Sequence, residues 1–333
     1  MEAKSIGEIP EGDQQYEPKW DGFRCLAFRD GKTVALQSKS GQPLGRYFPE
    51  TVRAFLELSP DKFVLDGEIV IERDGRLSFD DLLMRIHPAA SRIRKLSAET
   101  PASFLAFDLL VDGSGKSLAD MPLHERRRAL ESFFKDIGRN DRIQLSPATS
   151  DRGTALRWMR ELAGAGFDGV VAKDLAVPYA SGERTAMKKI KRMKTADCVV
   201  GGFRWASKGG QVGSLLLGLY DHDGLLHHVG FTSGFAGDQR RELKDILRPY
   251  MNGSGFTGRA PGGPSRWSTE RSGEWERLDP KLVCEVQYDH FSGERFRHGT
   301  RFLRWRPEKK PSQCTFEQVR IEPASFTELM RAA

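Results

Sequence analysis

The sequence predicts an α+β protein with two domains: a larger domain built on an antiparallel sheet, followed by a small β-barrel. With 333 residues, the chain is long enough to bury two hydrophobic cores. Up to about residue 195, short β-rich runs alternate with segments of helical periodicity. Beyond that point, short apolar runs separated by glycines surround one helical segment, which is typical of a small barrel.

The first domain is expected to span residues 1–194. Its apolar runs alternate with polar residues or are rich in β-branched and aromatic residues, so strands are expected at 24–28, 63–71, 104–107 and 169–172. Helices are expected at 122–134 and 154–163. In the first helix, apolar residues from Leu123 to Phe134 are spaced to lie on one face.

The second domain is expected to span residues 195–333 and to form a barrel of the OB type. Strands are expected at 198–201, 213–220, 225–230 and 282–288, with a helix at 238–247. The run NGSGFTGRAPGGP, residues 252–264, has no regular periodicity and predicts a long loop.

The composition excludes several classes of protein. Hydrophobic residues make up 38% and charged residues 29% of the chain, as in soluble globular proteins. No apolar run approaches the length needed to cross a bilayer, and residues 1–12 lack the apolar core of a secretion signal. We therefore expect a cytoplasmic protein without membrane contact.

The four cysteines are far apart in the sequence and form no C-x-x-C pair; they are Cys25, Cys198, Cys284 and Cys314. This spacing argues against a zinc ribbon and against a disulfide scaffold. We expect all four to be packing residues in a reducing compartment.

Basic residues predominate and are clustered, which favours a polyanionic partner. The net charge is +6 and the isoelectric point is near 9.1. Between Arg295 and Lys310 there are seven basic residues and one acid, Glu308. Aromatic residues interleave with these arginines, so the segment predicts a strand with one packed side and one phosphate-facing side. A second basic cluster spans residues 188–194.

The run KWDGFR, residues 19–24, is the main candidate for chemistry. It leads into the expected strand 24–28, so the amine of Lys19 is expected at the mouth of a strand. Lysine is normally an ammonium ion without a lone pair, and a nucleophilic role requires nearby positive charge that lowers its pKa. The cluster 188–194 could supply that charge. Alternatively, Asp21-Gly22 is a simple turn flanked by solvated Lys19 and Arg24.

Two further runs carry charge on one side of an expected strand. Alternation places Asp66 and Glu68 on the same face, which is costly unless they meet water, hydroxyls, a metal or cations. An exposed sheet face is the alternative. In Lys189-Ile190-Lys191, the same period directs both amines to one side.

From Lys19 onward, these motifs resemble those of the covalent nucleotidyltransferases, and most closely the ATP-dependent DNA ligases of the small bacterial two-domain ligase C type. The resemblance covers nearly the whole chain and is closest in TADCVVGGFRW and in FRHGTRFLRWRPEKKP. It implies an antiparallel-sheet nucleotidyltransferase domain, an ATP-grasp-like ligase core, followed by an OB-fold domain.

The resemblance also implies the reaction and its participants. Lys19 would take AMP from ATP as a phosphoramidate, pass it to the 5′-phosphate of a nick, and the 3′-hydroxyl would then displace AMP. The expected cofactors are ATP and Mg²⁺, with Mn²⁺ as a second candidate metal. The expected partner is nicked duplex DNA, bound by a monomer; the pathway served and any DNA-repair protein partners are left open.

Within the family, matching positions bind the nucleotide and the nick. Glu17 would contact the adenine amino group, Phe107 would stack on adenine, and Glu68 would hold the ribose. Arg24, which with Lys19 and Asp21 completes the catalytic motif, would contact nick and nucleotide. In Ser38-Lys39-Ser40-Gly41, lysine stands where arginine is commoner in the family, which keeps the charge for the nick phosphate but loses the bidentate fork.

The remaining matches concern the metal and the phosphates. Asp168, where the family normally has glutamate, would bind the metal together with Glu68, and its side chain is one methylene shorter. Lys189 and Lys191 would stabilise the α-phosphate and lower the pKa of Lys19, with Lys188 as a rival in the register.

The segment Arg306-Pro307-Glu308-Lys309 resembles the family's R-x-D-K motif. In the family this segment lies on the OB domain, closes over the pyrophosphate of ATP during the first step, and then swings away. A cation there neutralises the charge that develops on the leaving group. We therefore expect Arg306 and Lys309 to act in the first step.

Other functions remain as alternatives. RNA ligases and capping guanylyltransferases share the lysine motif, and a preference for GTP over ATP would favour capping. A catalytically inactive nucleic-acid-binding protein on the same scaffold would not need Lys19, Glu68, Lys189 and Lys191. An NAD-dependent ligase is disfavoured because a four-cysteine zinc site is missing. Eighteen residues precede Lys19, so we expect the two domains themselves to clamp DNA, through basic surfaces around Lys39, residues 188–194 and the barrel.

Overall fold

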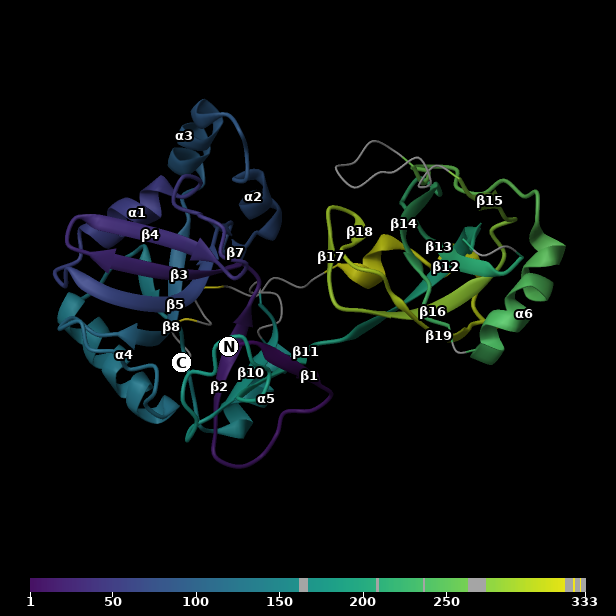
Figure 1. The fold of residues 1–333 in the computed structure, drawn as a ribbon. Helices are drawn as coiled ribbons and strands as arrows, with labels where there is room; N and C mark the ends of the chain where they lie inside the picture. Colours follow the sequence, from purple (N-terminus) through teal and green to yellow (C-terminus); the bar gives the residue numbers. More distant parts are fainter. Residues whose placement is uncertain are drawn as a thin grey trace. The chain divides into compact units, whose positions relative to one another are not determined.

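The computed structural model describes residues 1–161, 167–207, 210–235, 237–262, 274–320, 326 and 330. The chain forms two compact units (Figure 1). Unit 1 comprises residues 1–192 and 322–333, and unit 2 comprises residues 193–321.

The division between the units differs at the C-terminus from the predicted domains 1–194 and 195–333. The units separate between Arg192 and Met193, close to the predicted boundary. However, the ring of Phe326 packs edge-on against Trp20, with centroids 5.7 Å apart, and its backbone N–H donates to the carbonyl of Gly75 at 2.7 Å. Burial of this aromatic ring joins the end of the chain to unit 1 rather than to the second domain.

The larger sheet of unit 1 has the strand order β4-β3-β5-β8-β9 and is antiparallel except for the β8–β9 pair. Its strands are β3 (Phe23–Asp30), β4 (Thr33–Ser38), β5 (Lys62–Val70), β8 (Ser103–Val111) and β9 (Ile143–Leu145). The associated helices are α1 (Pro49–Leu56), α2 (Phe79–Met84), α3 (Ala90–Glu99) and α4 (Leu123–Ile137). A short hairpin of β6 (Glu72–Arg73) and β7 (Arg76–Leu77) follows β5. Phenylalanines such as Phe55, Phe63 and Phe104 fill the core between α1 and the sheet.

The smaller sheet of unit 1 has the order β1-β11-β10-β2. Its strands are β1 (Ala3–Ile6), β2 (Gln14–Trp20), β10 (Phe167–Asp174) and β11 (Met187–Lys191), and α5 (Arg152–Glu161) packs against β2 and β10. Trp158 on α5 is almost fully buried against this sheet. β2 of this sheet runs directly into β3 of the larger sheet, so Lys19 lies where the two sheets join (Figure 1).

Two glycines are required here by close backbone approach. A Cβ atom at Gly22, in the turn between β2 and β3, would lie 2.4 Å from the carbonyl oxygen of Ile69. A Cβ atom at Gly169 would lie 2.0 Å from the carbonyl oxygen of Ile190, on the neighbouring strand β11. Both contacts are far shorter than van der Waals distance, so a side chain at either position would force the strands apart.

The predicted elements of unit 1 are largely confirmed. α4 spans 123–137 where 122–134 was expected, because Leu123, Leu130 and Phe133 are buried against the sheet. α5 spans 152–161 where 154–163 was expected, and residues 162 and 163 lie outside the described residues. The strand expected at 104–107 extends to 103–111 as β8.

Unit 2 is an antiparallel sheet that curls toward a barrel, with the order β14-β13-β12-β16-β19 and β15 paired to β12. Its strands are β12 (Lys194–Trp205), β13 (Val212–Tyr220), β14 (Leu226–Thr232), β15 (Glu276–Arg277), β16 (Val283–Tyr288) and β19 (Arg301–Trp305), with a hairpin of β17 (Phe291–Ser292) and β18 (Arg295–Phe296). Helix α6 (Gly237–Leu247) and the 3-10 helices η1 (Arg248–Tyr250), η3 (Pro311–Gln313) and η4 (Phe316–Val319) complete it. The outer strands β14 and β19 meet at a parallel bridge between Thr232 and Thr300, which is consistent with a partly open barrel of the OB type.

Two details of unit 2 differ from the sequence expectation. The segment 295–310 was expected to form a strand, but it contains two short strands, β18 and β19, which lie in different sheets and are separated by residues 297–299, outside any strand. The expected loop 252–264 has no strand in its described part, 252–262, yet Phe256 in it packs against His228 and Trp275. Residues 263 and 264 lie outside the described residues.

The expectation that the cysteines are packing residues is confirmed: all four are buried and free of disulfides. Cys198 and Cys284 are directly opposite each other in β12 and β16. Within the described part of the chain, no helix is both long and apolar enough to cross a membrane.

Replacing Gly169 with alanine should destabilise unit 1, because the new Cβ would overlap the carbonyl oxygen of Ile190. We expect a loss of about 2 kcal/mol or more in the free energy of unfolding, measured by chemical denaturation. Gly7→Ala is the matched control, since a Cβ there meets nothing within 4 Å. Equal effects of the two substitutions would contradict the close-approach argument.

Candidate active site

A cavity of about 280 Å³ in unit 1 is lined by residues of both sheets. Its lining contains many of the predicted site residues, together with others that the sequence analysis had not singled out: Glu2, Glu17, Lys19, Arg24, Lys39, Glu68, Phe107, Lys173, Met187 and Lys189. A wider hollow of about 700 Å³ shares Glu2, Arg24, Lys39 and Glu68 with it. Residues that are far apart in the sequence therefore face one space that is large enough for a nucleotide.

Lys19 lies at the end of β2 with 23% of its side chain exposed, and its ammonium group donates to Asp168 Oδ1 at 2.7 Å. Burial would lower the pKa of Lys19, but the carboxylates of Asp168, Glu68 and Asp21 outweigh burial and raise that pKa above its ordinary value. The resting nucleophile candidate is therefore a charged ammonium ion.

This result corrects the expectation that nearby cations lower the pKa of Lys19. The cation that responds in this way is Lys189 on β11, whose pKa is lowered by burial and by repulsion from Lys19 and Lys191. Lys189 lines the cavity, and Lys191 acts on it from the same strand. The lysines are close enough to affect one another's pKa. At Lys19, however, the acids raise the pKa by more than burial and the cations lower it.

Asp168 reaches Lys19 because of an irregularity in β10. The pairing of β10 with β2 shifts register between Phe167 and Val170, so Asp168 lies in a bulge opposite the end of β2. A bulge redirects a side chain locally. The predicted metal ligand is thus an ion-pair partner of Lys19 in this structure.

Arg24 lines the cavity, and buried hydrogen-bond acceptors hold its side chain in place. Its guanidinium donates to both carboxylate oxygens of Asp66, at 3.1 and 2.6 Å, and to the backbone carbonyl of Met1. The hydroxyl of Tyr179 donates to Asp66 Oδ2 at 2.7 Å. Asp66 is fully buried, and its partners are a cation and a hydroxyl, two of the kinds of partner that the sequence analysis considered for Asp66 and Glu68.

Glu68, half-buried on β5, faces the same cavity as Lys19 and Arg24. Burial raises the pKa of its carboxyl to about 8, although Lys19 and Arg24 lower it in part. A carboxyl with such a pKa is largely protonated at neutral pH and can donate as well as accept a hydrogen bond.

Lys173 on β10 is a site residue that the sequence analysis missed. It is 2% exposed, its amine lies 2.7 Å from Glu17 Oε2, and the same amine lies 4.5 Å from the ring centroid of Phe107. The other oxygen of Glu17 accepts from Gln15 Nε2 at 2.6 Å. The available signal was a lysine directly after the apolar run Val170–Ala172, since a charge that is buried with such a run needs a partner.

Lys39 lines both hollows and pairs with Glu2, whose carboxylate lies 3.1 Å from the amine. The same carboxylate accepts from Arg184 at 2.9 Å. Lys39 is 59% exposed, so its charge remains accessible to a phosphate. Glu2 had not been predicted as a site residue.

The described residues contain no group of three or more His, Cys, Asp or Glu side chains arranged for a metal ion. Of the three carboxylates that act on Lys19, Glu68 lines the cavity and Asp168 contacts the Lys19 amine that lines it. Two such hard oxygen donors fit Mg²⁺, which commonly takes one or two carboxylates and completes its shell with substrate phosphates and water.

Arg306 and Lys309 lie in unit 2, after β19. Both donate to the carboxylate of Asp197 in β12, at 2.8 and 2.6 Å. The structure thus brings these two predicted residues together through an acid that the sequence analysis did not single out.

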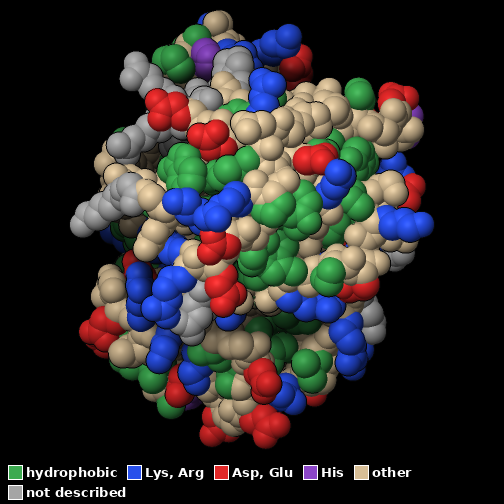
Figure 2. All heavy atoms as spheres, turned by 90° about the vertical axis from the view of Figure 1, so that its right-hand side faces the viewer, with side chains coloured by type: hydrophobic (Ala, Val, Ile, Leu, Met, Phe, Trp, Pro, Cys, Tyr) green, Lys and Arg blue, Asp and Glu red, His purple; other side chains and the backbone are tan. Residues whose placement is uncertain are grey.

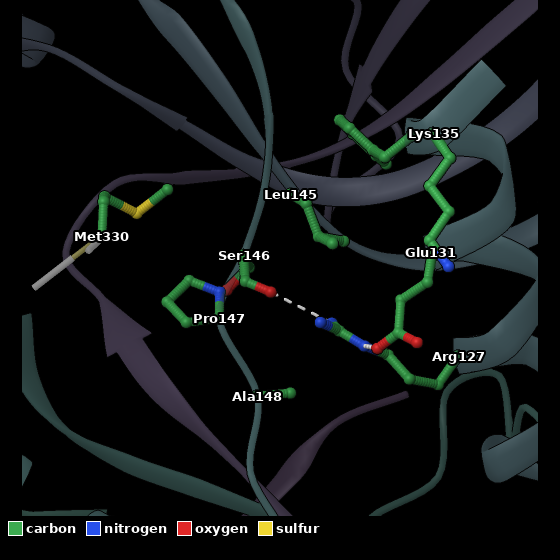
Figure 3. A pocket seen from close by; sticks show the side chains of 9 residues that line it. Arg127, Glu131, Lys135, Leu145, Ser146, Pro147, Ala148 and Met330 are labelled. Atoms are coloured by element: carbon green, nitrogen blue, oxygen red, sulfur yellow. Dashed lines mark hydrogen bonds and ion pairs between the residues drawn. The ribbon is translucent and has the colours of Figure 1, made fainter. Parts of the chain in front are cut away.

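A second cavity of unit 1, of about 450 Å³, lies between α4 and the segment after β9 (Figure 3). Arg127 points across it, pairing with Glu131 at 2.8 Å and donating to the backbone carbonyl of Ser146 at 3.0 Å. Its lining contains none of the predicted site residues. We therefore assign the chemistry to the first cavity.

Comparison with known proteins decides the family. The ATP dependent DNA ligase domain model matches residues 2–191, and the ATP dependent DNA ligase C terminal region model matches residues 208–309. The chain belongs to the ATP-dependent DNA ligases. The ligase is 45% identical to DNA ligase C2 of Mycolicibacterium smegmatis, over 98% of this chain and 95% of that protein. It is 43% identical to DNA ligase C of Mycobacterium tuberculosis, over 96% of this chain and 92% of that protein.

These relatives confirm the predicted small bacterial ligase C type and an ATP-dependent DNA ligase as the main function. A solved structure from the Lig E DNA ligases covers 92% of this ligase and 100% of that chain, with a TM-score of 0.56 and 17% identity. This likeness supports the predicted fold, a nucleotidyltransferase domain followed by an OB-fold domain.

Replacing Glu68 with glutamine should reduce the loss of stability as pH rises from about 4.5 to about 8. The ordinary carboxyl pKa is near 4.5, and burial raises that of Glu68 to about 8. As pH rises between these values, the unfolded chain releases the proton and the folded protein keeps it, so native stability is lost. We expect the difference in the free energy of unfolding, Glu68→Gln minus wild type, to increase by on the order of 1–3 kcal/mol from about pH 5 to about pH 9.

Denaturation at the two pH values measures this effect. Glu72→Gln, at an exposed position in β6, is the control and should show no such gain. A pH-independent difference for Glu68→Gln would contradict the burial argument.

Proposed function

We propose that the ligase seals nicks bearing a 5′-phosphate and a 3′-hydroxyl in duplex DNA, with Lys19 as the nucleophile. The amine of Lys19 forms a bond to the α-phosphorus of ATP, and the bond from that phosphorus to pyrophosphate breaks. The 5′-phosphate then takes AMP from Lys19, forming DNA-adenylate. Finally, the 3′-hydroxyl attacks the 5′-phosphorus and AMP leaves.

The observation that supports this proposal most is the position of Lys19. Its amine is 2.7 Å from Asp168 and lines a cavity together with Lys189, Glu68 and Phe107. A nucleophile, a cation for the phosphate and an aromatic ring for a base therefore face one space, as adenylyl transfer requires.

The proton on Lys19 must leave before the amine can attack. Asp168 already accepts a hydrogen bond from the ammonium, so it is the nearest group to receive that proton or to pass it to solvent. Because the acids raise the pKa of Lys19, they hold the amine in place at the cost of its nucleophilicity. The nearby cation Lys189 opposes the acids, and departure of Asp168 from its pair with Lys19 would favour the free amine when ATP binds.

The adenosine part of ATP would occupy the side of the cavity formed by Phe107 and Glu17. Lys173 neutralises the buried Glu17 and rests over the ring of Phe107, which holds both side chains in fixed positions. Lys39, being exposed at the rim, is suited to a phosphate of the nick. Glu68, with a partly protonated carboxyl, is suited to a ribose hydroxyl.

We propose Mg²⁺ as the metal, with Mn²⁺ as a substitute, held by Asp168 and by Glu68, whose carboxyl would release its proton on binding the metal. When bound, it would supply positive charge to the phosphates of ATP. Asp168 must leave its pair with Lys19 to take this role. The same carboxylate would then pair with Lys19 in the free protein and bind the metal once ATP is present.

Unit 2 offers basic and aromatic side chains to DNA. Trp205 is 40% exposed and the amine of Lys244 lies 6.0 Å from its ring centroid. Figure 2 shows Lys and Arg side chains beside hydrophobic side chains on one face of the molecule. Such surfaces combine backbone contacts with apolar packing on nucleic acid.

We propose further that the ligase works as a monomer in the cytoplasm. The soluble composition and the four buried, reduced cysteines support a reducing compartment. Its mass in solution, against 37.4 kDa for one chain, tests the monomer.

Replacing Lys19 with alanine should abolish the covalent AMP adduct, because no other amine is proposed to attack. Incubation with radiolabelled ATP and Mg²⁺, followed by denaturing electrophoresis, measures the adduct. Lys32→Ala, at an exposed position in the β3–β4 turn, is the control and should label like the wild type. Labelling of the Lys19 variant would assign the nucleophile elsewhere.

The same assay distinguishes the alternatives. Chasing the labelled protein with a nicked duplex should transfer AMP and seal the nick. Labelling by GTP in preference to ATP would favour a capping enzyme, and absence of any adduct in the wild type would favour an inactive binding protein.

Binding to nicked DNA should be strongly sensitive to salt, since basic surfaces contact phosphates. We expect affinity to fall roughly 100-fold between about 50 and about 200 mM monovalent salt, as four or more phosphate contacts imply. Fluorescence anisotropy with a labelled nicked duplex measures it, with Lys39→Ala expected to reduce the slope. A flat response would contradict the clamp.

A further inference from the structure

One carboxylate in unit 2 holds both cations of the segment 306–309. Asp197 Oδ1 lies 2.8 Å from Arg306 Nη1, and Asp197 Oδ2 lies 2.6 Å from Lys309 Nζ. Each oxygen therefore accepts from a different cation. The two positive side chains, three residues apart, converge on a single acid.

Asp197 is itself firmly placed. It is 7% exposed, and it lies in β12, whose neighbouring residue Cys198 is fully buried. Gln318 in η4 accepts from the backbone N–H of Asp197 at 3.1 Å and donates to its backbone carbonyl at 3.2 Å. The carboxylate thus projects from a rigid strand that is tied on both sides.

The other acids near Arg306 do not replace Asp197. Glu308 Oε1 lies 2.5 Å from Arg306 Nε but is 55% exposed, and Glu285 Oε2 lies 3.7 Å away while pairing with Arg304 at 2.7 Å. Asp197 is the buried carboxylate that joins Arg306 to Lys309. Two like charges this close repel each other unless an anion lies between them.

We propose that Asp197 is a positioning residue, which holds Arg306 and Lys309 as one paired-cation group for the pyrophosphate of ATP. This inference rests on the proposed function and on the expectation from the sequence that these two cations act on the leaving pyrophosphate. Asp197 does not touch ATP; it acts through the two side chains. It therefore affects adenylylation of Lys19, and the reverse reaction with pyrophosphate, but not the sealing of DNA-adenylate.

The test replaces Asp197 with asparagine, which keeps the shape and removes the charge. We expect the rate of AMP-adduct formation at limiting ATP to fall by about 10- to 100-fold. The pyrophosphate concentration needed to reverse the adduct should rise by a similar factor. Sealing of a pre-adenylylated nick should stay within about twofold of the wild type.

A double-mutant cycle separates positioning from general structural support. If Asp197 acts through the two cations, Asp197→Asn should add little to the loss already caused by Arg306→Ala together with Lys309→Ala. Full additivity of the losses would overturn the proposal. Asp245→Asn, which removes a carboxylate paired with Arg248 at 2.7 Å elsewhere in unit 2, is the matched control and should leave all three assays unchanged.

If Asp197→Asn does not fold, Gln318→Ala serves in its place, because it loosens the backbone of Asp197 without removing charge. It should show the same selective loss to a smaller degree. Equal loss of adduct formation and of sealing in either variant would overturn the inference. Absence of any adduct in the wild type would instead overturn the proposed function.

Discussion

The ion pair between Lys19 and Asp168 is the interaction on which the site depends. It joins the end of β2 to the bulge in β10, and so fixes the amine at the point where the two sheets of unit 1 meet. The same pairing makes the amine less nucleophilic, because it stabilises the ammonium form, which has no lone pair. The pair that places the amine therefore also has to separate before the amine can attack.

Ion pairing recurs through the molecule: charged side chains that would be costly to bury alone are paired with an opposite charge. Arg24 with Asp66, Lys173 with Glu17, and the cations of unit 2 with Asp197 each place a functional side chain against a protein partner. A buried pair contributes little net stability, because desolvation offsets the attraction, but it restricts where each group can go. The partners are thus as much a part of the site as the groups expected to touch ATP.

Sequence patterns predicted the features that depend on residues close together in the sequence. The apolar face of α4 and the strands β5 and β8 were predicted. The sequence analysis expected cations to determine the pKa of Lys19 and missed its pair with Asp168. Asp168 is 149 residues away and reaches Lys19 through a register shift in β10. Lys173 and Asp197 were missed because each lies next to a short apolar run, and the neighbouring sequence does not show which partner neutralises it. Phe326 was assigned to the wrong unit because its contact with Trp20 is set by tertiary packing.

The burial of all four thiols has a practical consequence. Burial raises the pKa of Cys25 and of Cys314 to about 12, and that of Cys198 and Cys284 also lies well above the ordinary value. Alkylating reagents act on exposed thiolates, so the native cysteines should stay unmodified in the folded ligase. A cysteine introduced on the surface of each unit would then be selectively labelled with a donor and an acceptor dye, without removing any native residue. Energy transfer between the dyes would follow the separation of the two units through the catalytic cycle.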